Sequence, residues 1–167
     1  MLSRMTVAAI ALGLGQVPAP QFNPDWGVIF PTRNVTLPIV QCSREVPKPI
    51  GGMWTPDQAT IHRLDKVLAP VLQEAIDQER PLPSKRSTAS SYYRQYFGLV
   101  VDGRQIIYIN GFHETYLKLW VAASPGSRPN WRDKPVDACD GWTLFFGAEY
   151  DPATHTVQRI RFNGRAG

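Results

Sequence analysis

A helical repeat of apolar residues begins shortly after Trp54. Thr55, Pro56 and a glutamine three residues after Thr55 have the order of a helix start, with Thr55 as the expected N-cap. Apolar residues then recur at three- and four-residue steps, which predicts one buried face: Ile61, Leu64, Leu68, Val71, Leu72 and Ala75. Pro70 interrupts the repeat, so we expect one kinked helix or two short helices that end by Arg80.

Residues 92–101 and 104–112 are rich in aromatic and β-branched side chains, and Asp102-Gly103 separates them. A two-residue turn of this type predicts a hairpin and sets its register. The expected pairs are Leu99 with Ile106 and Phe97 with Tyr108 on one face, and Gly98 with Ile107 and Tyr96 with Ile109 on the other. Both faces are partly apolar, so one should pack on the helix while the other is covered or available to a partner.

A second hairpin is predicted from residues 141–150 and 156–162. One helix followed by two hairpins predicts an α+β domain, in which the helix packs on an antiparallel sheet of at least four strands. This outline is cystatin-like. Short apolar runs at residues 26–30 and 35–40 lie among prolines and have the character of edge strands.

Residues 1–19 have the pattern of a secretory signal peptide. Arg4 precedes an apolar run from Met5 to Gly15, and Val17-Pro18-Ala19 offers small residues for cleavage. The run is too short to span a bilayer, so we expect no transmembrane anchor after signal removal. The predicted organisation is a signal peptide at 1–19, a proline-rich extended segment at 20–50 and a single α+β domain at 51–164.

The two cysteines agree with export to the periplasm or the outside of the cell. Cys42 and Cys139 are the only cysteines among 167 residues, and an even number in an oxidising compartment predicts a disulfide. The formal net charge is +4, and the basic residues are dispersed along the chain. A nucleic-acid-binding protein concentrates such residues on one face, so we expect no nucleic-acid partner.

Enzymatic chemistry has weak support in the sequence. The best candidate residues for a metal or a hydrolytic site are His113 and Glu114, with Asp137 and Asp140 as carboxylates more distant in the sequence. The spacing fits no known metal-ligand pattern, and the chain has no nucleophile motif and no phosphate-binding loop. We therefore predict neither a catalytic residue nor a metal or other cofactor, and keep a small hydrolase or metal-dependent enzyme at these residues as an alternative.

Aromatic and arginine side chains provide the candidate binding surface. Arg128, Trp131 and Arg132 lie in a polar loop where no core pattern requires a tryptophan, and Arg94 and Tyr96 lie on the first hairpin. Arginines and aromatic residues dominate binding hot spots. Such a surface predicts a protein or small-molecule partner in the cell envelope.

Several segments resemble those of small exported bacterial proteins of unknown function. The resemblance covers residues 50–164 and rests on Gly52-Met53-Trp54-Thr55-Pro56, Tyr92-Tyr93-Arg94-Gln95-Tyr96, residues 136–141, residues 146–154 and Phe162-Asn163-Gly164. It implies a bacterial periplasmic protein and carries no activity. The favoured interpretation is a non-enzymatic binding or inhibitor module of the bacterial envelope, and a structural envelope protein is a further alternative.

Overall fold

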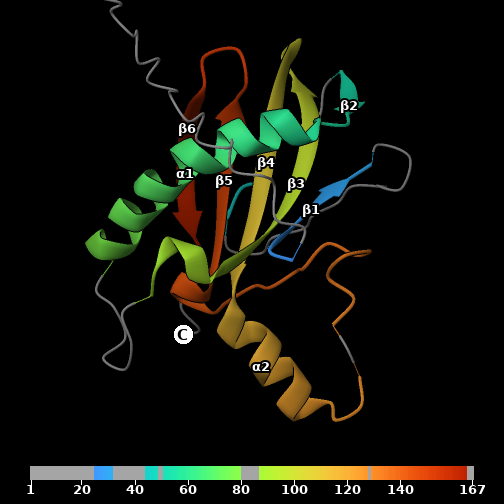
Figure 1. Ribbon diagram of the computed structural model, residues 1–167, viewed down its shortest axis with the longest axis vertical. Coiled ribbons are helices and arrows are strands. Elements are labelled where there is room, and N and C mark those ends of the chain that lie inside the picture. The colour runs from blue at the N-terminus through green and yellow to red at the C-terminus, as the bar shows by residue number, and fades with distance from the viewer. Residues whose placement is uncertain (1–24, 32–43, 49–50, 80–86, 128, 165–167) are drawn as a thin grey trace, which may run out of the picture.

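Six strands and two helices make up the fold of the computed structural model (Figure 1), which describes residues 25–31, 44–48, 51–79, 87–127 and 129–164. The elements in chain order are β1 (Gly27–Phe30), β2 (Gly52–Trp54), α1 (Gln58–Gln78), β3 (Tyr92–Val101), β4 (Arg104–His113), α2 (Glu114–Ala123), β5 (Phe145–Asp151) and β6 (Thr156–Phe162). The sheet order is β1-β3-β4-β5-β6, and β2 pairs with the other end of β3. Only β1 pairs in parallel with its neighbour, so the α+β class is confirmed with a mostly antiparallel open sheet.

Both predicted hairpins are present, and the register of the first is confirmed. Leu99 lies opposite Ile106, and Tyr96 lies opposite Ile109. Asp102 and Gly103 both have positive φ angles, 51° and 73°. These angles are typical of the tight turn whose twist matches that of the two strands.

Helix α1 differs from the prediction at two points. Its N-cap is Asp57, whose side chain accepts a hydrogen bond from the Thr60 backbone N–H at 2.7 Å, rather than Thr55. The helix also continues through Pro70 from Gln58 to Gln78, so the expectation of two short helices is wrong. Pro70 lies on the exposed side of the helix, where its ring does not disturb the buried side chains.

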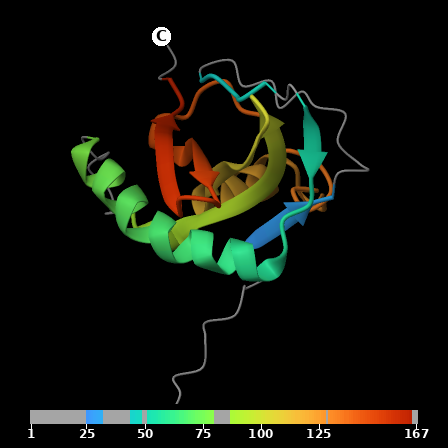
Figure 2. The same ribbon diagram turned by 90° about the horizontal axis from the view of Figure 1, so that it is seen from above.

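The two faces of the sheet are covered by different parts of the chain. On the helix face, α1 packs on alternate residues of β3, β4 and β5, including Tyr96, Ile109 and Phe146. The opposite face, which we call the loop face, is covered by residues 44–48 and by the loop that follows α2. Figure 2 shows α1 along one side of the curved sheet and these segments on the other.

Helix α2 was not predicted from the sequence. It begins directly after β4 and projects from the body of the molecule (Figure 1), and none of its residues is fully buried. Two residues that precede the predicted domain start at residue 51, Phe30 and Arg44, are buried in the described structure.

Candidate functional site

Two buried side-chain amides form a hydrogen-bond network on the loop face of the sheet. Gln95 on β3 and Asn110 on β4 are cross-strand neighbours, and Asn110 Nδ2 donates to Gln95 Oε1 at 2.8 Å. The same oxygen accepts from the Val136 backbone N–H at 2.8 Å. Gln95 Nε2 donates to the carbonyls of Trp131 and Lys134 at 2.5 and 2.9 Å. The amides therefore fix the loop over residues 131–136 on the sheet.

Arg44 extends this network toward the end of the sheet formed by β5 and β6. Its guanidinium is buried and donates to three neutral acceptors: Tyr108 Oη at 3.2 Å, Asn110 Oδ1 and Asn163 Oδ1. No carboxylate of the described residues forms an ion pair with it. A guanidinium has five N–H donors, so these three bonds leave part of its donor capacity unused. Burying a cation without a counter-ion is costly, which leaves Arg44 suited to an anion.

A β-bulge in β6 brings two further arginines to the same face. The pairing of β6 with β5 shifts between Gly147 and Glu149, and Arg159 adopts a left-handed conformation with a φ of 55°. Val157 before the shift and Ile160 after it both contact the core under α1. In a regular strand Arg159 and Arg161 would lie on the helix face together with Val157. The extra residue at the bulge reverses the alternation, so both arginines lie on the loop face instead.

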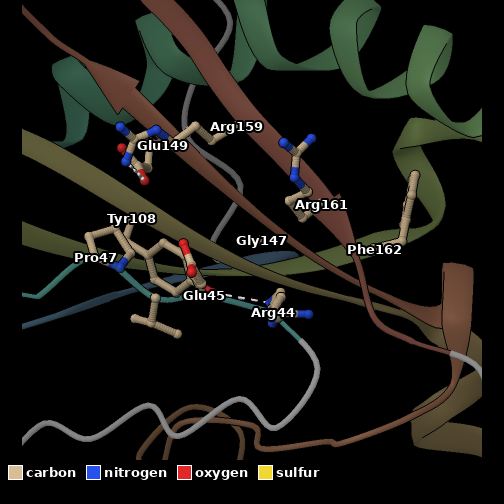
Figure 3. A pocket seen from close by; sticks show the side chains of 10 residues that line it. Arg44, Glu45, Pro47, Tyr108, Gly147, Glu149, Arg159, Arg161 and Phe162 are labelled. Atoms are coloured by element: carbon tan, nitrogen blue, oxygen red, sulfur yellow. Dashed lines mark hydrogen bonds and ion pairs between the residues drawn. The ribbon is translucent and has the colours of Figure 1, made fainter.

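These residues line a pocket of about 470 Å³ on the loop face (Figure 3). Its lining comprises Arg44, Glu45, Val46, Pro47, Tyr108, Gly147, Glu149, Arg159, Arg161 and Phe162. Gly147 is required at the base, since a Cβ there would lie 2.7 Å from the Tyr108 hydroxyl and 2.8 Å from Arg44 Nε. A side chain at this position would displace the two groups that face the pocket.

The charges in the pocket do not cancel. Glu149 pairs with Arg159 at 3.1 Å, and Glu45 is exposed at the rim. Arg161 has no carboxylate partner among the described residues, and its Nη1 donates only to the Ile160 carbonyl at 3.4 Å. Burial raises the pKa of Tyr108, although the Arg44 guanidinium opposes the shift, so its hydroxyl stays neutral at physiological pH. The pocket therefore presents two guanidinium groups, Arg44 and Arg161, without carboxylate partners.

The predicted binding residues are not brought together. Arg94 and Tyr96 lie on the helix face, where both contact Asp65 of α1, at 3.5 and 2.6 Å. Burial raises the pKa of the Asp65 carboxyl, against the opposing effects of Arg94 and Tyr96.

Trp131 lies on the opposite face of the sheet from Arg94 and Tyr96. Its side chain is only 8% exposed, because it packs against Tyr93 and Phe112. The expectation that no core requires Trp131 is therefore wrong. Arg132 lies over the Trp131 ring at 4.4 Å, and Arg128 is outside the described residues.

The residues of the enzymatic alternative have local roles. His113 caps α2 by accepting from the Thr115 N–H at 3.1 Å, and Glu114 pairs with Lys118 at 3.2 Å. In the part of the chain that the structure describes, no group of three or more His, Cys, Asp or Glu side chains is arranged to hold a metal ion. Asp137 and Asp140 thus do not join His113 in such a group.

Cys42 lies outside the described residues, so its pairing with Cys139 stays a prediction. The signal peptide at residues 1–19 and the expected strand at 35–40 also lie outside them. Within the described residues, no helix combines the length and the apolar character needed to cross a bilayer.

The sequence matches no known family model, and no curated protein or solved structure is similar enough to count as a match. The cystatin-like outline and the resemblance to exported bacterial proteins therefore stay predictions.

Sequence reasoning missed Arg44 and Arg161 as site residues. One signal was available: Gln95 and Asn110 stand at cross-strand positions, each between aromatic or aliphatic residues of its strand or next to them. Buried amides are retained when they hydrogen-bond to a specific neighbour. This placement indicates a polar network on that face, although not which residues complete it.

Proposed function

We propose that this protein is a non-enzymatic binding module that takes a small anionic ligand, with a carboxylate or phosphate group, in the pocket of Figure 3. One observation carries the proposal: Arg44 and Arg161 face one pocket and neither has a carboxylate partner among the described residues. Guanidinium groups bind carboxylate and phosphate through paired, charge-assisted hydrogen bonds. An entering anion would supply the counter-charge that Arg44 lacks.

The pocket is organised before a ligand enters. Three acceptors fix the Arg44 guanidinium, and Gly147 leaves the space in front of it open. Fixing the binding groups in advance lowers the entropy lost on binding. We place this module in the periplasm or outside the cell, as the predicted signal peptide and cysteine pair indicate, and its cystatin-like outline is part of the same proposal.

Isothermal titration calorimetry with inorganic phosphate and with citrate tests the proposal. Arg161→Gln removes an exposed guanidinium and should lower the affinity about tenfold or more, because a hydrogen bond to a charged group contributes about 1.5 to 3 kcal/mol. Arg104→Gln is the matched control, since Arg104 is exposed at the far end of β4 and does not line the pocket. Equal losses in the two variants would indicate unspecific attraction to net charge, and no binding of either anion would refute the proposal.

A further inference from the structure

The sheet ends at β6 while α1 continues beyond it. Strand β6 is the last in the order β1-β3-β4-β5-β6, so no described strand pairs with its outer edge. Figures 1 and 2 both show the C-terminal part of α1 extending past this edge. The helix therefore overhangs the main-chain N–H and C=O groups on the outer edge of β6.

A groove follows the overhang. Two hollows of about 290 and 410 Å³ lie between α1 and β6 and share Ala75, Gln78 and Ile160 in their lining. Val71 and Val157 line the first hollow, and Trp142 lines the second. The groove thus runs along most of β6. Apolar side chains line it on both sides, but Glu74, Gln78 and Glu79 of α1 line it as well.

Val71 is an apolar residue of this groove whose side chain is exposed. Its position in the helical repeat predicts burial with Leu68 and Leu72, yet its side chain is 38% exposed. Leu68 and Leu72 are buried over the sheet, whereas Val71 faces the region beyond β6. The apolar stripe of α1 is therefore wider than the sheet that it covers.

We propose that an extended peptide segment of a partner protein pairs with the outer edge of β6 beneath α1, and that apolar and acidic residues alternate along this segment. Side chains of a strand point alternately to the two faces of a sheet. On the helix face, the added strand would cover Val71 and Ala75. On the loop face, it would meet Arg159 and Arg161, which lie on that side of β6 and favour acidic side chains. Added strands of this kind bind through main-chain hydrogen bonds and gain specificity from alternate side chains.

A second copy of this chain fits the edge less well. In an antiparallel pairing of two β6 strands, the arginines of one copy would approach those of the other, and like charges across strands are destabilising. This repulsion between arginines favours an acidic partner over a second copy.

Fluorescence anisotropy with labelled peptides tests the inference on the oxidised, full-length domain. The probe is a capped peptide of about eight residues in which valine and glutamate alternate, long enough to pair along β6. A peptide of the same composition, in which all valines precede all glutamates, should bind at least about tenfold more weakly. A copy of the alternating peptide that is N-methylated on the edge-facing amides should also lose binding, because it cannot donate to β6.

Two matched variants locate the site. Ala75→Arg fills the groove and should weaken binding of the alternating peptide at least about tenfold. Ala59→Arg makes the same change at an exposed position near the start of α1 and should leave binding unchanged. Equal binding of the two peptides, or an unaffected Ala75→Arg variant, would overturn the inference. Self-association that Ala75→Arg abolishes would overturn it as well, by identifying a second copy as the occupant.

The peptide experiment and the anion-binding experiment can succeed or fail independently of each other. Arg161 belongs to both regions, but Ala75 does not line the pocket. Phosphate affinity should therefore be the same in Ala75→Arg and in the unmodified protein, whichever way the peptide experiment turns out.

Discussion

Gln95 is the residue on which the loop face depends most. Its side-chain amide makes four hydrogen bonds, two of them to backbone carbonyls and one to a backbone N–H of the loop at residues 131–136. Three of the partner residues, Asn110, Trp131 and Val136, are buried. The side chain is fully buried, so no part of it exchanges these bonds for water. A buried amide that satisfies all its partners holds a loop in one arrangement, whereas a partly satisfied one is destabilising.

Replacing Gln95 with leucine keeps the approximate volume and removes all four bonds. We expect the free energy of unfolding to fall by about 2 to 4 kcal/mol, since each buried group left without a partner costs about 1 to 3 kcal/mol. Chemical denaturation measures this loss, and hydrogen exchange of the Val136 amide reports release of the loop. Gln105→Leu is the control, because Gln105 is exposed on the neighbouring strand β4. A Gln95→Leu variant as stable as its control would show that the network contributes nothing.

At the scale of elements, the sequence predicted what is long or locally determined and missed what is short. The apolar repeat identified α1 because this helix is long, at 21 residues, and the two-residue turn identified β3 and β4 with their register. Helix α2 has only 10 residues, a length at which an isolated helix is marginal. Its cap is His113, which is not among the residues that usually mark a helix start. Strand β1 was expected at an edge, but its parallel pairing with β3 depends on contacts far apart in sequence.

The cap of α2 makes part of the stability depend on pH. Burial lowers the pKa of His113 below its ordinary value of 6.5, while nearby Glu114 raises it and Lys118 lowers it. Nδ1 accepts from the Thr115 N–H, and protonation would convert this acceptor into a donor. The unfolded chain therefore binds the proton more readily than the folded protein does. The stabilising contribution is complete above pH 6.5 and is lost as the pH falls below it.

Thermal unfolding of the protein and of His113→Asn between about pH 7.5 and pH 5.5, a range that spans the ordinary histidine pKa, measures this contribution. Asparagine is a good cap that does not titrate, so the variant should lose less stability than the unmodified protein as the pH falls over this range. His62 and His155 are present in both proteins and provide the common background. Parallel pH profiles of the two proteins would contradict the assignment.

At the scale of the whole molecule, the pocket could not be predicted because its residues meet only in the folded chain. Arg44, Tyr108, Glu149 and Arg161 come from four separate segments, and the β6 bulge that turns Arg161 toward the pocket has no sequence signature. The burial of Trp131 could not be predicted for a related reason. The aromatic side chains that bury Trp131 come from β3 and β4. The loop that carries Trp131 follows α2, which the sequence did not predict, so this contact could not be foreseen.

Asn163 joins three distant parts of the chain near the predicted disulfide. It accepts from Arg44, two residues after Cys42, and donates to the carbonyls of Ala138 and Asp140 at 2.6 and 3.1 Å. These carbonyls lie on either side of Cys139. Arg44 therefore lies close to the segment that contains Cys139, which favours the predicted bond between the two cysteines.

Reduction of that bond should lower the free energy of unfolding by about 4 to 5 kcal/mol, the value expected for closing a loop of about 100 residues in the unfolded chain. Guanidinium denaturation with and without dithiothreitol measures the change. The Cys42→Ser/Cys139→Ser double variant should match the reduced protein and should not respond to the reductant. Phosphate affinity should fall on reduction as well, because the segment that carries Arg44 loses its covalent anchor beside Asn163. Two thiols that react with iodoacetamide in the native, unreduced protein would show that the cysteines are not paired.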